Sequence, residues 1–227
     1  MDIEQRPVGA TTRVGFADPL RLFPGARSRL PGVVIIKQGF YATTWKPVVD
    51  RLLAAILLLA LLPTLLVIAG VVRWKLGPGV LFRQDRVGRQ GRVFTIYKFR
   101  TMAHATVGDD VTAKTVDDRR HTPVGRVLRR LSLDELPQLW NVLRGDMSLV
   151  GPRPEMVELV DRYDLWQHPR HAVRPGLTGR WQVSPWRSRP LHEHLDEDLP
   201  YIERVTLLGD LRILAATAST MARRSGS

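Results

Sequence analysis

The longest apolar segment of the chain runs from Leu52 to Val72 without a charged residue, between Arg51 and Arg73. About 20 apolar residues are enough for a helix to cross a bilayer. Pro63 lies near the middle, where it removes a backbone hydrogen bond and favours a kink. Basic residues flank both ends, so the positive-inside rule gives no clear orientation. A straight span and a re-entrant helix bent at Pro63 both remain open, and the residues alone favour the span, because prolines are tolerated in spans.

The alternation of apolar and polar residues after this segment predicts a β-hairpin over residues 80–100, turning at Gly88 to Gly91. In its second arm, the period of two places Lys98 and Arg100 on one face. For either cation alone, a solvated basic strand is the plain interpretation. The polar residues 103–120 predict a loop.

The stretch from Ser132 to Glu155 places two adjacent carboxylates before an apolar run of helical spacing. Ser132 and Glu135 fit a capping box, which puts Asp134 and Glu135 at a helix N-terminus, and Gly145 ends the predicted helix. For an isolated Asp-Glu pair, capping would be the favoured interpretation. Here the acids also have arginines on both sides.

Arg129 belongs to a predicted amphipathic helix over residues 126–133, suited to a lipid headgroup layer or to a plain protein surface. Arg153 is held on a stiff loop by Pro152 and Pro154. The guanidinium of Arg153 could hold phosphate oxygens in a bidentate contact.

The remaining C-terminal pattern predicts a helix from Met156 to Trp166, a short strand at Trp181 to Val183 and an amphipathic helix from Tyr201 to Met221. His192 and His194, near Asp196, could suggest a metal site. We expect a solvated helix start instead, because residues two apart do not share a helix face. The predicted fold class is mainly α with a small β-hairpin.

The charge balance is strongly basic, with 34 Lys and Arg against 22 Asp and Glu and a net charge of +12. An excess of this size points to an anionic partner, such as phosphates, nucleic acid or an acidic lipid surface. The chain has no cysteine, which excludes disulfides and thiolate metal sites. This composition agrees with a reducing compartment.

Three motifs carry a family resemblance: SLDELPQLWNVLRGDMSLVGPRPE, from Ser132 to Glu155; KFRTM, from Lys98 to Met102; and RPGLTG, from Arg174 to Gly179. They resemble the bacterial sugar transferase family, the small monotopic phosphoglycosyl transferases. The resemblance covers the chain from about Lys46 to its end. It implies transfer of a sugar 1-phosphate from a nucleotide diphosphate sugar, UDP-linked, to polyprenyl phosphate, at the cytoplasmic face of the bacterial inner membrane. This would be the first membrane step of polysaccharide or glycoconjugate assembly.

The resemblance also implies a re-entrant helix over residues 46–76, bent at Pro63, and a membrane-surface catalytic domain over residues 77–227. The preceding residues 1–45 are expected to form a mobile basic tail, because residues 1 to about 31 are rich in Pro, Gly and Arg and have no apolar periodicity. The family commonly has Ser before this proline, and this chain has Leu62. It also has Ser184-Pro-Trp-Arg187 where relatives often have a Gly-Arg pair.

Asp134 is the predicted nucleophile, forming an aspartyl phosphosugar intermediate, and Asp134 with Glu135 is expected to bind Mg²⁺, with Mn²⁺ as an alternative. The predicted phosphate-binding residues are Arg129, Arg153, Lys98 and Arg100. Anionic lipids are expected partners, a homodimer is compatible, and no nucleic acid is expected. One rival interpretation is a membrane-anchored basic module without catalysis. Another is a different membrane phosphotransferase acting on a lipid alcohol.

Overall fold

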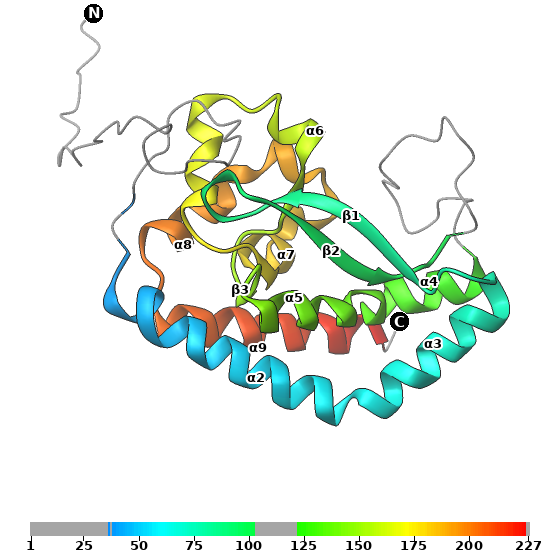
Figure 1. Ribbon diagram of the computed structural model, residues 1–227. Coiled ribbons are helices and arrows are strands. Elements are labelled where there is room, and N and C mark those ends of the chain that lie inside the picture. The colour runs from blue at the N-terminus through cyan, green and yellow to red at the C-terminus, as the bar shows by residue number, and fades with distance from the viewer. Residues whose placement is uncertain (1–35, 37, 103–121, 226–227) are drawn as a thin grey trace, which may run out of the picture.

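The computed structural model describes residues 36, 38–102 and 122–225. Most of the predicted tail and the predicted loop over residues 103–120 lie outside these residues. The described chain is largely helical, with two small sheets (Figure 1). The predicted class, mainly α with a small β-hairpin, is confirmed for this part of the chain.

The apolar segment forms two helices that meet at an angle. A π-helical turn, Tyr41–Trp45, leads into α2 (Lys46–Ala60), and α3 (Leu62–Leu76) follows at a bend of 63°. The chain turns at Leu61, and Pro63 lies in the first turn of α3, where its missing N–H is tolerated. The predicted bend is therefore confirmed. No single described helix is long and apolar enough to cross a membrane, whereas the bent pair together has the length and composition to do so.

The predicted hairpin consists of β1 (Leu81–Val87) and β2 (Val93–Phe99), joined by the 3₁₀ turn η2 (Arg89–Gly91). A third strand, β4 (Glu155–Met156), pairs with the end of β1, so the sheet order is β2-β1-β4. This pairing ties the segment that follows Pro152-Arg153-Pro154 to the hairpin.

A second sheet pairs β3 (Ser148–Val150) in parallel with β5 (Gly176–Thr178). A Cβ added at Gly176 would collide with the backbone of Gly151, and one added at Gly151 would collide with the Arg174 carbonyl. Glycine is thus needed for the close approach of these two backbones. The RPGLTG motif therefore has a packing role. It pairs with β3, the strand that leads into the Pro-Arg-Pro loop.

Two predictions for the C-terminal half are wrong. The segment from Met156 to Trp166 is not one helix, because Met156 pairs in the sheet and only α6 (Val157–Val160) is helical before a break. A capping box at Asp164 then begins the 3₁₀ helix η4 (Leu165–Ala172). The strand expected at Trp181 is instead α7 (Arg180–Val183), because the strand pairing occurs one segment earlier, in β5.

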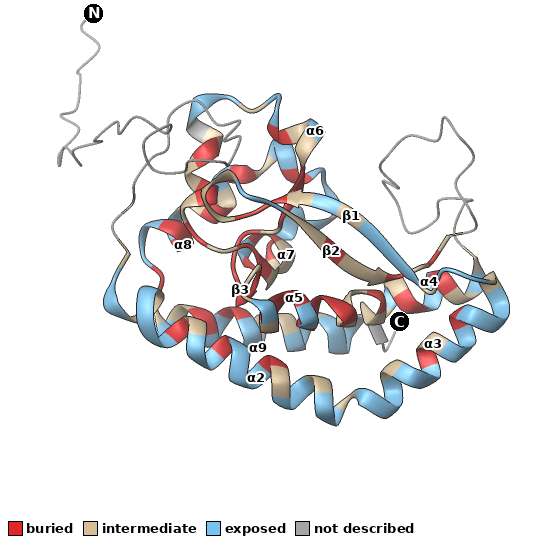
Figure 2. Cartoon of the chain, viewed as in Figure 1, coloured by how far each residue is buried: buried red, intermediate tan, exposed pale blue. Residues whose placement is uncertain are grey.

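The chain ends in two helices, α8 (Leu199–Glu203) and α9 (Leu207–Ser225), after three short 3₁₀ turns. These turns are η5 (Pro185–Ser188), η6 (Leu191–Glu193) and η7 (Leu195–Asp198). The amphipathic stretch predicted from Tyr201 is thus split between α8 and α9. Helix α9 buries Asp210 and Ile213 and exposes much of its opposite side (Figure 2).

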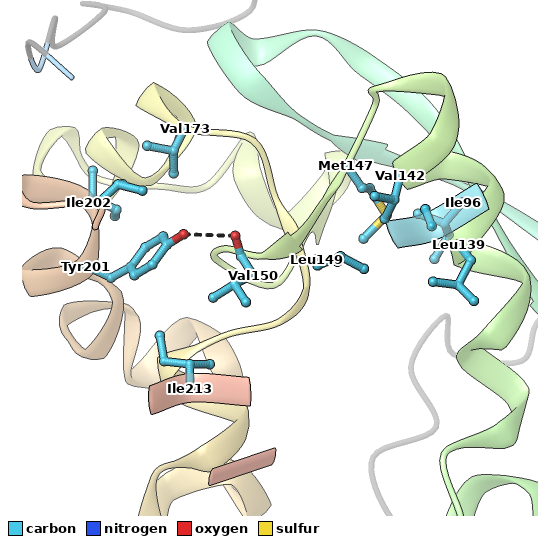
Figure 3. Packing of buried hydrophobic residues seen from close by; sticks show 12 residues of the cluster. Ile96, Leu139, Val142, Met147, Leu149, Val150, Val173, Tyr201, Ile202 and Ile213 are labelled. Atoms are coloured by element: carbon cyan, nitrogen blue, oxygen red, sulfur yellow. Dashed lines mark hydrogen bonds between the residues drawn. The ribbon is translucent and has the colours of Figure 1, made fainter. Parts of the chain in front are cut away.

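One hydrophobic cluster joins the two halves of the chain. It contains Ala54 of α2 and core residues from β2, β3, α8 and α9, together with residues of the helix that follows the Asp-Glu pair (Figure 3). The Tyr201 hydroxyl donates a hydrogen bond of 2.9 Å to the Val150 carbonyl within this cluster. Helix α2 therefore packs on the same core that supports the β3 strand.

Candidate active site

Asp134 and Glu135 lie in the 3₁₀ helix η3 (Leu133–Gln138), which continues into α5 (Leu139–Arg144) and ends at Gly145 in a left-handed conformation. The predicted end of this helix is confirmed. The predicted capping box is wrong, because Ser132 itself has a left-handed backbone, with φ 56°, and its side chain makes no capping bond. The Glu135 side chain therefore points to other partners.

Glu135 is held by two cations from distant parts of the sequence. Its Oε1 accepts hydrogen bonds from Lys98 Nζ and from Arg153 Nη2, each of 2.8 Å. Burial alone would raise the pKa of Glu135, but the charges and hydrogen bonds of Arg153 and Lys98 outweigh it and hold this pKa well below its ordinary value. Glu135 is therefore an anion with a fixed orientation.

Asp134 has a different environment. It is only 7% exposed, and its carboxylate accepts no hydrogen bond within the described residues. Burial, followed by the charge of Glu135, raises the pKa of Asp134 to about 6, against the opposing charges of Lys98, Arg129 and Arg153. The two adjacent acids are thus divided into a restrained carboxylate and one whose oxygens are available for another partner.

The structure brings together most of the predicted phosphate-binding residues. Lys98 and Arg153 contact Glu135 directly, and Arg129, in the last turn of α4 (Pro123–Arg130), is close enough to act on the charge of Asp134. Arg100 has a different place. Its guanidinium donates to the carbonyls of Leu76 and Gly77, at the end of α3, so it anchors the apolar helix pair to the hairpin.

Asn141 is a positioning residue that the sequence patterns do not reveal. It is fully buried in α5, its Nδ2 donates to the Thr95 carbonyl at 2.8 Å, and its Oδ1 accepts from the Tyr97 amide at 3.2 Å. These bonds fix β2, which carries Lys98, against the segment that carries the acids. Neither the apolar periodicity around Trp140 nor any motif indicates that Asn141 connects this helix to β2.

Arg170 fixes the Pro-Arg-Pro loop in a similar way. Its Nη2 donates to the Arg153 carbonyl at 2.7 Å and pairs with Asp198 at 3.2 Å, while its Nη1 donates to the Tyr163 hydroxyl at 2.8 Å. Arg170 and Asp198 are both almost completely buried. No local pattern distinguishes Arg170 from the many exposed arginines, so only the fold reveals this role.

The residues fit a divalent cation only together with a substrate. Within the described chain, no group of three His, Asp or Glu side chains could hold a metal ion. His194 stacks on Trp186, with ring centroids 4.7 Å apart. Asp134 and Glu135 offer two carboxylates, and Mg²⁺ in phosphate-transfer sites takes one or two carboxylates and completes its shell with phosphate oxygens and water.

A family model described as bacterial sugar transferase matches residues 41–224. The chain belongs to the bacterial sugar transferase family. This membership confirms the resemblance inferred from the three motifs and the predicted class of enzyme, a transferase.

Several curated proteins are similar to this transferase. The UDP-glucose:undecaprenyl-phosphate glucose-1-phosphate transferase of Xanthomonas campestris pv. campestris is 42% identical over 200 residues, which cover 82% of this chain and 41% of the relative. The uncharacterized sugar transferase EpsL of Bacillus subtilis is 41% identical over 73% of this chain and 82% of its own length. The exopolysaccharide production protein ExoY of Sinorhizobium fredii is 38% identical over 78% of this chain and 85% of its own length.

The transferase carries a buried histidine that predicts its response to acid. Burial, followed by the charges of Arg170 and His168, lowers the pKa of His171 to about 3. In an unfolded chain, a histidine binds a proton near pH 6.5. The neutral His171 therefore contributes fully to stability above about pH 6.5, and this contribution falls as the pH drops toward about 3, at up to roughly 1.4 kcal/mol per pH unit.

We expect the unfolding temperature of the transferase to decrease as the pH is lowered from about 7 to about 5. His171→Gln removes this titration and should flatten the dependence, whereas His192→Gln, at an exposed position, should not. Thermal unfolding followed by circular dichroism measures both. Equal pH dependence in the two variants would show that His171 does not carry the effect.

Proposed function

We propose that this chain transfers a sugar 1-phosphate from a UDP-sugar to a polyprenyl phosphate and releases the nucleoside monophosphate. The observation that carries the proposal is the difference within the Asp134-Glu135 pair: two cations fix the Glu135 carboxylate, whereas the Asp134 carboxylate accepts no hydrogen bond from the described part of the chain. Two relatives, from Xanthomonas campestris and Escherichia coli, are named UDP-glucose:undecaprenyl-phosphate glucose-1-phosphate transferases, which supports this substrate class. The proposal places the reaction in exopolysaccharide or glycoconjugate assembly.

In the first step, an oxygen of the ionised Asp134 carboxylate attacks the phosphorus that bears the sugar. A bond forms between this oxygen and phosphorus, the phosphoanhydride bond breaks, and the nucleoside monophosphate leaves with the electron pair. The product is an acyl phosphate that carries the sugar on Asp134. Its buried position keeps water from this mixed anhydride.

In the second step, an oxygen of the polyprenyl phosphate attacks the same phosphorus. The acyl phosphate bond breaks, the Asp134 carboxylate is regenerated, and the lipid-linked diphosphate sugar leaves. Both steps exchange one anhydride bond of the phosphosugar for another, so no oxidant or reductant is needed.

The cations around the pair would neutralise the diphosphate during both steps. Arg129 and Arg153, whose charges act on Asp134, would hold phosphate oxygens, and Lys98 would keep Glu135 ionised beside them. Mg²⁺, or Mn²⁺, bound by Asp134 and Glu135 would supply further charge neutralisation at the diphosphate. Arg100 has no part in this proposal, because its guanidinium binds the end of α3.

An isotope-exchange experiment tests the covalent route. Labelled nucleoside monophosphate should enter the donor UDP-sugar without any polyprenyl phosphate, because the first step is reversible and independent of the acceptor. Glu135→Gln should slow this exchange about 100-fold or more, since it leaves Lys98 and Arg153 without their buried partner. Exchange that appears only after the acceptor is added would favour direct transfer, and no exchange together with salt-sensitive nucleic-acid binding would favour the binding-module rival.

We further propose that α2 and α3 form a re-entrant membrane hairpin. Their outward sides expose large apolar side chains, including Leu59, Leu66, Val67 and Trp74. An exposed apolar surface of this kind marks a site of contact with another apolar surface, and the hydrocarbon of the bilayer would cover it. The bend between α2 and α3 points away from the rest of the domain, while the other ends of the two helices return to it (Figures 1 and 2).

Single cysteines on either side of the hairpin test this topology, since the chain has no cysteine of its own. Thr43→Cys and Arg83→Cys, both at exposed positions, should resist a membrane-impermeant thiol reagent in intact cells and react after lysis. Labelling of one variant but not the other in intact cells would establish a span. Labelling of both would place the domain outside the cytoplasm.

A further inference from the structure

Arginines from three separate parts of the sequence lie around Arg174, two of them against Gly145. Arg174 Nε donates to the Gly145 carbonyl at 3.0 Å. The guanidinium of Arg51, on α2, lies against the same glycine, where an added Cβ would collide with it. Arg89, in the η2 turn of the hairpin, lines a small, open pocket together with Arg174.

This arginine cluster, Arg51, Arg89 and Arg174, has no anionic partner within the described chain. None of the three forms an ion pair with a described carboxylate, and the buried Nε of Arg89 has no hydrogen-bond acceptor. Burial, and then the charges of Arg89 and Arg51, lower the pKa of Arg174, while Asp50 opposes this shift. The guanidinium groups therefore repel one another in the absence of an anion.

The nearby acids are already occupied. Asp50, which lines the same pocket, accepts a hydrogen bond of 2.5 Å from Ser148 and pairs with Lys46 at 3.4 Å. Asp210 takes the same lysine at 2.7 Å. The charges of Asp50 and Asp210 balance those of Lys46 and one arginine. The other two arginines leave an excess of positive charge around the pocket.

We infer that Arg51, Arg89 and Arg174 form a second phosphate-binding site, separate from the Asp134-Glu135 pair. Guanidinium groups match phosphate oxygens in charge and in bidentate geometry. The cluster lies at the turn of the hairpin, whereas Lys98 lies at the other end of β2, and none of its arginines is among the main charges that shift the pKa of Asp134. The function proposed above does not require this site.

The phosphate could belong to a phospholipid headgroup or to a soluble phosphate compound. Arg51 directly precedes Leu52 and Leu53 on α2, and both leucines are exposed, at 60% and 40%. A phospholipid whose headgroup is held by the arginine cluster can lay its acyl chains along this apolar side of α2. The geometry therefore favours the lipid headgroup.

Equilibrium dialysis of the purified full-length chain in detergent against labelled inorganic phosphate tests the site. Arg51→Gln/Arg89→Gln should remove one class of phosphate sites or weaken it about tenfold or more, because charged hydrogen bonds are lost. Arg73→Gln/Arg212→Gln removes the same charge from exposed positions on α3 and α9 and should leave binding unchanged. Arg51→Gln alone, at an exposed position, should weaken the site without any risk to folding.

A competition arm distinguishes the two sources. Short-chain phosphatidylglycerol should displace phosphate from this site in the wild-type chain. In the double variant, which lacks the site, the lipid should cause no such displacement. Phosphatidylcholine should displace less phosphate than phosphatidylglycerol. Displacement identifies a lipid-headgroup site, and retention of phosphate identifies a site for soluble phosphate compounds. Equal phosphate binding by the arginine-cluster variant, its single variant and the control variant would overturn the inference.

Discussion

Asp134→Asn is expected to lower the rate of sugar-phosphate transfer by about 10⁴-fold or more, the range found when a covalent nucleophile is removed. The uncharged amide of Asn is too weak a nucleophile to form the acyl phosphate. The fold should be unaffected, because the Asp134 carboxylate accepts no hydrogen bond within the described residues and burial already disfavours its charged form. Membrane association should also stay unchanged.

The matched control is Asp196→Asn, which makes the same chemical change at an exposed acid and should retain full activity. Mass spectrometry of the wild-type protein incubated with donor alone should find the phosphosugar adduct on Asp134. An adduct on another residue would refute the assignment of the nucleophile, as would full activity of Asp134→Asn.

Asp210→Ala is expected to lower the free energy of unfolding by about 3 kcal/mol, at the lower end of the range for breaking a buried ion pair. Asp210 Oδ2 accepts from Lys46 Nζ at 2.7 Å and from the Tyr41 hydroxyl at 2.8 Å, and its Oδ1 accepts from the Tyr201 hydroxyl at 2.8 Å. Removing it leaves these donors without a shared acceptor. The lower value is expected because Asp50 still lies 3.4 Å from Lys46, and Tyr201 keeps its bond to Val150.

Denaturant unfolding in detergent, followed by tryptophan fluorescence, measures this change. Glu203→Ala removes an exposed acid at the end of α8 and should change stability by less than about 0.5 kcal/mol. Asp210→Ala should also make the start of α2 more susceptible to limited proteolysis, because the bonds from Lys46 and Tyr41 to α9 are lost. Equal stability of the two variants would show that this network does not hold α2 to α9.

Much of the fold follows from local patterns. The break at Pro63, the hairpin turn at Gly88 to Gly91 and the helix end at Gly145 each depend on backbone restrictions of proline or glycine that act within a few residues. The predictions that are wrong depend on partners far along the chain. Met156 has a helical pattern after it, yet it pairs with Arg86 in the sheet, and no local signal specifies that pairing.

The candidate site divides in the same way. The adjacency of Asp134 and Glu135 is covalent, so the sequence alone places them together, and the flanking prolines predict a rigid Arg153. Ser132 fits a capping box by residue type, but its left-handed backbone and the two cations on Glu135 prevent that arrangement. A competing ion pair is stronger than a backbone cap, and only the assembled site supplies it.

The sequence by itself therefore determined the kink in the apolar segment near Pro63, the hairpin, the acidic pair and the family, because each depends on neighbouring residues or on contiguous motifs. The tertiary structure decided that Glu135 is restrained while Asp134 is available, that Arg100 anchors α3, and that Asn141 and Arg170 position the site. These outcomes depend on which buried charges and polar groups meet in three dimensions. Since an unpaired buried charge is costly, packing selects the partners, and residue spacing along the chain does not encode them.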